Sequence, residues 1–163
     1  MDGDYNNYNY RKGVGAFVLK KGTQLIFSAE RINEPEAWQI PQGGVNPNED
    51  DYDAVIRELR EETGIHSVKL LNYTKDRYNY DFPKDIREKR AKRGWIAYKG
   101  QSMKFFLLEF FGDDSEINLN FSDEVEFSHW KWTSVDTIIE QMVDFKKAAV
   151  TAGAKELFLH NFT

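Results

Sequence analysis

The chain has 163 residues, with 22 Lys and Arg, 27 Asp and Glu, and no Cys. Its length suits one domain, and 40% hydrophobic with 30% charged residues argues against wholesale disorder. The lack of Cys excludes a disulfide scaffold, a thiol nucleophile and a Cys-ligated zinc or iron–sulfur site. No apolar run approaches the ~20 residues of a membrane span, and the polar start lacks the apolar segment of a secretory signal. We therefore expect a cytoplasmic protein with no membrane partner.

The net charge of −5 is distributed unevenly along the chain. Residues 75–95 hold eight basic and four acidic side chains, so this segment carries +4 and the rest carries −9. An acidic body with one basic segment suits a polyanionic ligand at a defined place better than the coating of DNA. A solvated basic loop or short helix explains the segment equally well, so charge alone leaves both interpretations open.

The first half of the chain predicts short strands, a flexible turn and one helix. Apolar or alternating runs predict strands at 13–19, 25–27 and 38–40. Pro41 tends to end the third of these strands, and Gly43-Gly44 then predicts a flexible turn. Residues 50–63 have a helical period.

The second half adds more strands and a second helix. Alternating or apolar runs predict strands at 67–74, 77–82, 104–111 and 127–132. The charged segment 83–100 is expected to be irregular. Apolar spacing predicts a helix over 134–149 that ends before Gly153. We expect a mixed α/β protein in which residues 1–9 form a flexible tail and 10–163 a single domain.

The helix predicted at 50–63 carries three carboxylates on one face. At ~100° per residue, Glu58, Glu61 and Glu62 lie close together. Such like-charge pairs cost ~0.2–0.5 kcal/mol each, and the helix dipole adds to the cost near a C-terminus. A hard divalent cation such as Mg²⁺ explains the arrangement, because it prefers carboxylate oxygens. For this motif alone, a solvated acidic face neutralised by Arg57 and Arg60 remains the simpler interpretation.

The segment 43–65 resembles the Nudix box, G-x5-E-x7-R-E-U-x-E-E-x-G-U with U a bulky aliphatic residue, in every fixed position. The resemblance implies a Nudix α/β/α sandwich with a mixed central sheet, in which the box forms a loop, a helix and a loop. It also implies hydrolysis of a nucleoside diphosphate linked to another group, with a divalent metal. Asn48 stands where the family usually has Gly, and Asn tolerates positive φ well enough to keep the loop.

The resemblance assigns roles to the fixed residues of the box. The side chains of Glu58, Glu61 and Glu62, with the backbone of Gly43, are expected to form the site for Mg²⁺, with Mn²⁺ as a possible substitute. Arg57 is expected to orient the glutamates, and Glu49 to support the loop and helix. These five side chains and one backbone position are the centre of the expected site.

The residues before the box narrow the resemblance. Residues 38–45, WQIPQGGV, are similar to the lead-in of a Nudix subgroup that contains bacterial RNA 5′-pyrophosphohydrolases and the diadenosine polyphosphate hydrolases of bacteria and plants. The implied reaction removes pyrophosphate from a 5′-triphosphorylated RNA, or phosphate from a 5′-diphosphorylated one. It leaves a monophosphate end and exposes the message to decay. The alternative is an Ap4A-type hydrolase, which the sequence hardly separates from the first. A catalytically inactive Nudix module and a nucleotide-pool hydrolase are weaker alternatives.

The same resemblance suggests further site residues. Glu126 is a candidate for another metal ligand or the general base, and Glu62 competes for the role of base. Residues expected to hold phosphates, line the pocket or stack on a base are Arg11, Arg31, Lys146, Tyr80, Gln101 and Phe145. Tyr80 and Phe145 fit a role in core packing equally well. The expected partner is 5′-triphosphorylated RNA or a dinucleoside polyphosphate, with no DNA, and a monomer is favoured.

Overall fold

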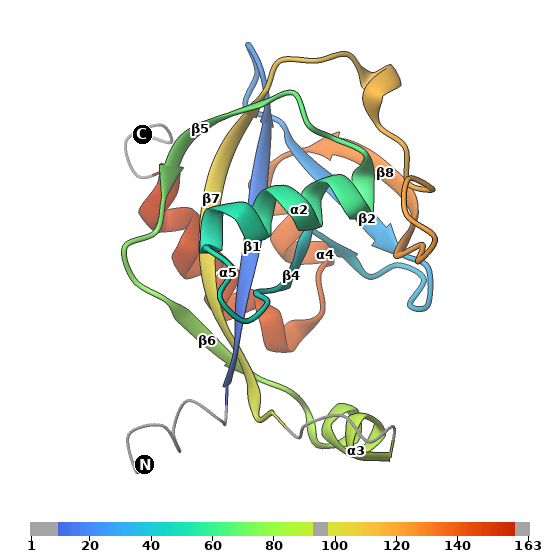
Figure 1. The fold of residues 1–163 in the computed structure, drawn as a ribbon, viewed down its shortest axis with the longest axis vertical. Helices are drawn as coiled ribbons and strands as arrows, with labels where there is room; N and C mark the ends of the chain where they lie inside the picture. The colour runs from blue at the N-terminus through green and yellow to red at the C-terminus, as the bar shows by residue number, and fades with distance from the viewer. Residues whose placement is uncertain (1–9, 93–97, 159–163) are drawn as a thin grey trace.

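A computed structural model describes residues 10–92 and 98–158, so the expected tail at 1–9 lies outside the described residues. One mixed sheet has a helix on one face and two helices on the other (Figure 1). The predicted α/β/α sandwich with a mixed central sheet is confirmed. No helix in the described part of the chain is both long and apolar enough to cross a membrane.

The sheet is built on two long central strands. Strands β1 and β7 run parallel in register from the pair Tyr10–Gly100 to the pair Lys20–Phe110. The other strands pair antiparallel with β1, β2 or β7, in the order β3-β2-β1-β7-β5 with β4, β6 and β8 off this path. The strands are β1 (Tyr10–Lys20), β2 (Ile26–Arg31), β3 (Trp38–Gln39), β4 (Gln42–Gly44), β5 (Val68–Tyr73), β6 (Tyr78–Asp81), β7 (Gly100–Phe110) and β8 (Phe127–Thr133).

Alternation along β1 divides the hydrophobic core into two. Val14, Ala16 and Val18 pack with Val55 and other buried residues of α2 (Asp51–Thr63) on one face. Phe17, between them, packs on the other face with residues of α4 (Val135–Gln141) and α5 (Asp144–Phe158). Side chains of a strand point to opposite faces with a period of two, so the central strand holds both layers of helices.

Two segments differ from the sequence prediction because short-range signals were misread. Residues Gln42–Gly44 form strand β4, which pairs with β1, where a turn was expected. Glycine in a strand marks a close approach by another group, and here side chains from α2 and β1 lie against Gly43 and Gly44. Residues Lys84–Lys92 form helix α3, where irregular chain was expected. Pro83 precedes a run of good helix formers with basic residues in the last turn, so the local signals for a helix were present.

The predicted helix over 134–149 is also wrong in its bounds. Met142 adopts an extended conformation (φ −86°, ψ 164°) and ends α4, while α5 starts at Asp144 and continues to Phe158. Met142 stays buried, so the apolar spacing continues across the break and hides it from the sequence pattern. Gly153 lies inside α5 rather than beyond its end. A Cβ at this position would overlap the ring of Phe105, so close packing accounts for the glycine. The single turn of 3₁₀ helix η1 covers Asp114–Glu116.

Candidate metal and phosphate site

The loop before α2 fixes how the helix begins. Asn48 has a positive φ of 65°, as its position in the box predicted. The carboxylate of Glu49 accepts a hydrogen bond from the backbone N–H of Asn46 at 2.9 Å, and Asp50 caps the first turn of α2. At the other end, Gly64 ends the helix in the left-handed conformation, with φ 75°. The box therefore forms the expected loop, helix and loop.

Arg57 is the centre of a hydrogen-bonded network on α2. Its Nε and Nη2 donate to the carboxylate of Glu49 at 2.8 and 2.9 Å. Its Nη1 donates to Glu58 at 2.9 Å and to Glu61 at 3.3 Å, and Nη2 also reaches the carbonyl oxygen of Gly44 at 2.9 Å. The hydrogen bonds from Arg57 lower the pKa of Glu49 to about 2. One guanidinium thus joins strand β4, the loop and two of the three box glutamates.

Glu62 is the buried member of the carboxylate group. Only 6% of its surface is exposed, and it accepts a hydrogen bond from the backbone N–H of Gln42 at 3.3 Å. Burial, followed by the negative charge of neighbouring Glu58, raises the pKa of Glu62 well above its ordinary value. Burial also raises the pKa of Glu58. Two adjacent, desolvated carboxyl groups make this position costly unless a proton or a cation neutralises them.

Glu126 lies close enough to the carboxylate group to act on it electrostatically. Its charge adds to the rise in the pKa of Glu62, while its own side chain is exposed just before β8. Its backbone carbonyl accepts a hydrogen bond from Ile32 at 2.9 Å, which holds the segment against the end of β2. The structure therefore places Glu126 beside the box but shows no direct contact between the two carboxylates.

The donor set fits a hard divalent cation. All four predicted ligand side chains offer carboxylate oxygens, and the carboxyl group of Glu58 lies where a Cβ at Gly43 would be, close to the backbone of that glycine. Within residues 10–92 and 98–158, no three such side chains converge as a ready-made metal group. Arg57 binds the carboxylates of Glu58 and Glu61. A metal would compete with that guanidinium for both carboxylates.

Cationic side chains gather on the other side of strand β4. The guanidinium of Arg11 lies directly over Gly44, where a Cβ would overlap it. Lys146 is 4% exposed, and burial lowers its pKa to about 8 while its Nζ donates to Gln39 at 3.2 Å. The positive charge of Arg31 lowers the pKa of Lys146 further. The structure thus brings together the three cations that the sequence suggested as phosphate contacts.

A fourth cation of this group, Arg90, was missed by the sequence reasoning. Burial lowers its pKa, and so do the charges of Arg11 and Arg31, which places it beside them. It comes from α3, and the only sequence signal for it was the +4 charge of residues 75–95. Arg11 and Arg31 thus lie near Arg90, and Arg31 and Arg90 lie near Lys146. Such a group of cations suits a ligand with several negative charges.

Gln42 connects the carboxylate group to Tyr80, on which the charges of Arg90 and Arg31 act. Its backbone N–H binds Glu62, and its Nε2 donates to the hydroxyl of Tyr80 at 3.3 Å. That hydroxyl donates to Gln101 at 3.0 Å, and burial raises the pKa of Tyr80 to about 12. The ring of Phe145 lies 5.7 Å from that of Tyr80 and packs half-buried against the core. Tyr80 and Phe145 therefore have a packing role, and any contact they make with a base is additional.

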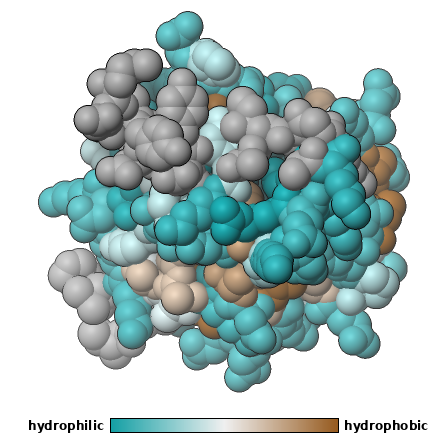
Figure 2. Space-filling view, turned by 90° about the horizontal axis from the view of Figure 1, so that it is seen from below, coloured by the Kyte–Doolittle hydropathy of each residue, from teal (hydrophilic) through white to brown (hydrophobic). Residues whose placement is uncertain are grey.

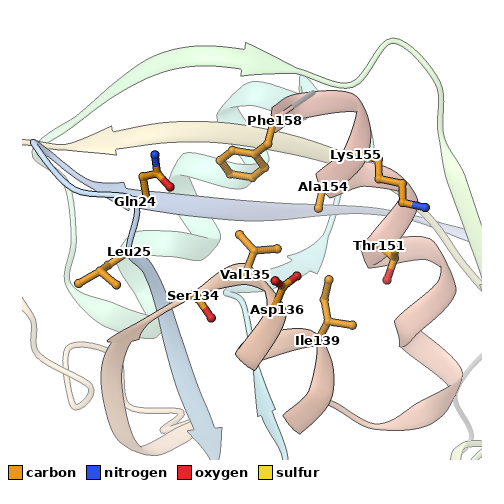
Figure 3. A pocket seen from close by; sticks show the side chains of 10 residues that line it. All are labelled: Gln24, Leu25, Ser134, Val135, Asp136, Ile139, Thr151, Ala154, Lys155 and Phe158. Atoms are coloured by element: carbon orange, nitrogen blue, oxygen red, sulfur yellow. The ribbon is translucent and has the colours of Figure 1, made fainter. Parts of the chain in front are cut away.

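A separate pocket of about 680 Å³ lies away from this site, between the start of β2 and helices α4 and α5 (Figure 3). Leu25, Val135, Ile139 and Phe158 form much of its lining, and Asp136 and Lys155 are its charged members. It contains none of the residues predicted for catalysis, metal or phosphate binding. Apolar walls with two opposite charges do not suit a polyphosphate.

The NUDIX domain family matches residues 9–153 of this chain. The match covers most of the chain, including the whole carboxylate network around Arg57.

The chain belongs to the Nudix family.

The Nudix relatives include plant and bacterial proteins. The chain is 47% identical over 140 residues to Nudix hydrolase 26, chloroplastic, of Arabidopsis thaliana, which covers 85% of this chain and 64% of that protein. The chain therefore spans less than two thirds of the length of this plant relative. It is 41% identical over 145 residues to the RNA pyrophosphohydrolase of Zymomonas mobilis, covering 87% of this chain and 90% of that one.

Solved structures agree on the fold. The E. coli dihydroneopterin triphosphate pyrophosphohydrolase superposes with a TM-score of 0.70 over 92% of this chain and 98% of that one. Its sequence identity is 15%, so this likeness concerns the Nudix fold alone.

Proposed function

We propose that this protein is a cytoplasmic, metal-dependent RNA 5′-pyrophosphohydrolase that converts 5′-triphosphate or 5′-diphosphate RNA ends to 5′-monophosphate ends. The observation that carries the proposal is the meeting of a carboxylate group on α2 with a cation group around Lys146, close enough for the charge of Glu62 to act on the pKa of Lys146. Bacterial relatives named RNA pyrophosphohydrolase that align over most of their length support the choice of RNA.

The cation group has the charge to hold the polyphosphate. Arg11 lies on Gly44, and the charge of Glu62 acts on Lys146, so one polyphosphate would contact both the cations and the carboxylates. Arg31 and Lys146 would hold the other phosphates of the same chain. Tyr80 and Gln101 would form the polar floor between these positions, and Phe145 would present its half-exposed ring to the first base.

The carboxylates would hold Mg²⁺, with Mn²⁺ as a substitute. Glu58, Glu61 and Glu62 are the proposed ligands, with Glu126 and the backbone of Gly43 beside them. When bound, the metal would neutralise phosphate oxygens and lower the pKa of water. Arg57 would release Glu58 and Glu61 to the metal while keeping its bonds to Glu49 and Gly44, so the helix would hold its position.

Two glutamates compete for the role of general base, which takes the proton of the attacking water. Glu62 is the stronger candidate because burial raises its pKa well above the ordinary value of a glutamate, which makes its carboxylate a better proton acceptor. Glu126 is exposed on the loop before β8 and is free to approach a bound substrate. The variants Glu62→Gln and Glu126→Gln would separate the roles, because loss of the base flattens the acid side of the profile of kcat against pH.

A competition assay tests the choice of substrate. The protein with Mg²⁺ receives equal concentrations of a short 5′-triphosphate RNA and Ap4A, and initial rates and products are followed together. We expect faster conversion of the RNA to its monophosphate, and no turnover after chelation of the metal. Faster cleavage of Ap4A would replace RNA with a dinucleoside polyphosphate as the substrate.

A further inference from the structure

Helix α3 is a basic surface element with no established role. It comes between β6 and β7 in the order of elements and lies at one end of the molecule (Figure 1). Seen from that end, the surface is mainly hydrophilic, with smaller hydrophobic areas (Figure 2). Lys84, Arg87, Lys89 and Lys92 of α3 are exposed. Across residues 10–92 and 98–158, none of these four makes an ion pair with a carboxylate.

One side of α3 is fixed to the wall of the candidate site. Ile86 packs against the core cluster that contains Tyr80 and Phe82. The guanidinium of Arg90, one turn later, lies 4.5 Å from the centroid of the Phe82 ring, which is a cation–π contact. The rings of Phe82 and Tyr80 are themselves in edge contact at 6.0 Å. The helix therefore has a defined orientation relative to the polar floor of the site.

This orientation produces a row of positive charges that leads away from the site. Lys84, Arg87 and Arg90 are spaced three residues apart, and such residues are neighbours on a helix surface, ~5–6 Å apart at Cβ. Arg90 is half-buried beside Arg11 and Arg31, whereas Arg87 and Lys84 are exposed. The row starts at the cations proposed to bind the 5′ polyphosphate and ends in solvent.

We infer that the row of Lys84, Arg87 and Arg90 binds the backbone phosphates that follow the first nucleotide of an RNA substrate. This inference rests on the proposed function, because it assumes that the 5′ polyphosphate lies at Arg11, Arg31 and Lys146. A free nucleotide or a dinucleoside polyphosphate has no phosphates beyond that group. Only a polynucleotide chain continues from it, so the row favours RNA over small substrates and sets the direction in which the chain leaves.

The test uses RNA length as the variable. Initial rates are measured for 5′-triphosphate RNAs of two and eight nucleotides, with the wild type and with the double variant Lys84→Gln/Arg87→Gln. We expect KM for the octamer to rise about fivefold to tenfold. KM for the dinucleotide should change less than twofold, because its one backbone phosphate lies at Arg90, the end of the row that the double variant leaves intact. The salt dependence of log kcat/KM for the octamer should become shallower by about 1.4, since each neutralised single-strand phosphate contributes about 0.7.

Matched variants separate position from total charge. Lys69→Gln/Lys155→Gln removes the same charge from exposed lysines on β5 and α5 and should leave both substrates unaffected. The charge-keeping swap Lys84→Arg/Arg87→Lys should retain the octamer KM of the wild type. Thermal melts of all variants check folding, and the single variants Lys84→Gln and Arg87→Gln test the row if the double Gln variant does not fold.

The outcomes distinguish this inference from the proposed function. If the wild type converts both RNAs but the double Gln variant raises KM equally for both lengths, or for neither, the row does not bind the following phosphates and the proposed function stands. An equal effect of the β5 and α5 control would show that only net charge matters, which also overturns the row. If the wild type converts neither RNA, the proposed function fails and the inference fails with it.

Discussion

Helices α2 and α3 carry opposite charges and are held in the molecule in opposite ways. α2 buries Val55, Leu59 and even Glu62 against the sheet, and Arg57 binds its acidic side chains. α3 packs through Ile86 and Arg90, while its remaining cations extend into solvent. Charges that are costly and fixed suit chemistry, since their geometry is set before a ligand arrives. Charges that are exposed and unpaired suit the attraction of a long polyanion.

The largest expected effect concerns the buried carboxylate of α2. Glu62→Gln should lower kcat on 5′-triphosphate RNA by roughly 10²–10⁴-fold, the usual contribution of a general base. The free energy of unfolding should stay equal or rise, because an amide in this buried position avoids the desolvation of a charge. Steady-state kinetics and denaturant unfolding would measure both. Glu140→Gln, an exposed position on α4, is the control, and near-normal turnover of Glu62→Gln would contradict the site.

Removal of the guanidinium at the centre of α2 should act on stability. Arg57→Ala leaves Glu49, Glu58 and Glu61 without their shared partner, so we expect a loss of about 2–3 kcal/mol in the free energy of unfolding. Urea titration would measure it. Arg60→Ala, on the same helix and exposed, is the matched control and should cost less than about 0.5 kcal/mol. Equal losses in the two variants would show that the hydrogen bonds of Arg57 do not contribute measurably to the free energy of unfolding.

Burial of Lys146 predicts that the free energy of unfolding depends on pH. The pKa of Lys146 falls from about 10.4 in the unfolded chain to about 8 when folded. Between these values the unfolded state binds more protons, so this group adds stability as pH rises from about 8 to 10.5. Lys146→Met should therefore be more stable than the wild type at pH 7, by about 1–3 kcal/mol.

That difference should shrink as the pH approaches 10.5, which thermal melts across the range would follow. A difference that stays constant from pH 7 to 10.5 would mean that Lys146 titrates at its ordinary value. Substrate binding by Lys146→Met should weaken at the same time, because the variant lacks a proposed phosphate contact.

The smallest expected effect on stability is at α3. Lys84→Gln/Lys89→Gln changes two exposed side chains without ion pairs among the described residues, so the free energy of unfolding should change by less than about 0.5 kcal/mol. Chemical denaturation would measure it. A loss as large as that of Arg57→Ala would show that α3 depends on its charges for folding. The exposed charges of α3 would then matter for stability as much as the fixed charges of α2.

The sequence predicted the parts of this fold that local patterns control. The helical period of residues 50–63, the apolar run at 13–19 that lies within β1 and the positive φ of Asn48 all follow from short-range chemistry. The break at Met142 was not predictable, because the buried methionine keeps the helical spacing while the backbone turns extended. Gly153 was read as a helix end because its contact with Phe105 is a tertiary one.

The candidate site also contains residues that the local sequence predicts and one that only tertiary packing places. The box gave the positions of Arg57 and its glutamates, because their partners lie within one loop and one helix. Arg90 was missed because its place beside Arg11 depends on the packing of α3 on Phe82, which no local pattern contains. The roles of the individual site residues remain predictions for experiment.

The most direct measurement is the identity of the 5′ end after reaction. A triphosphate RNA labelled at its α-phosphate is incubated with the wild type and with Glu62→Gln, each with and without Mg²⁺. We predict a labelled 5′-monophosphate end only for the wild type with Mg²⁺, with release of pyrophosphate or of phosphate in two steps. An unchanged triphosphate end in the wild-type reaction with Mg²⁺, or equal conversion by Glu62→Gln, would contradict the account.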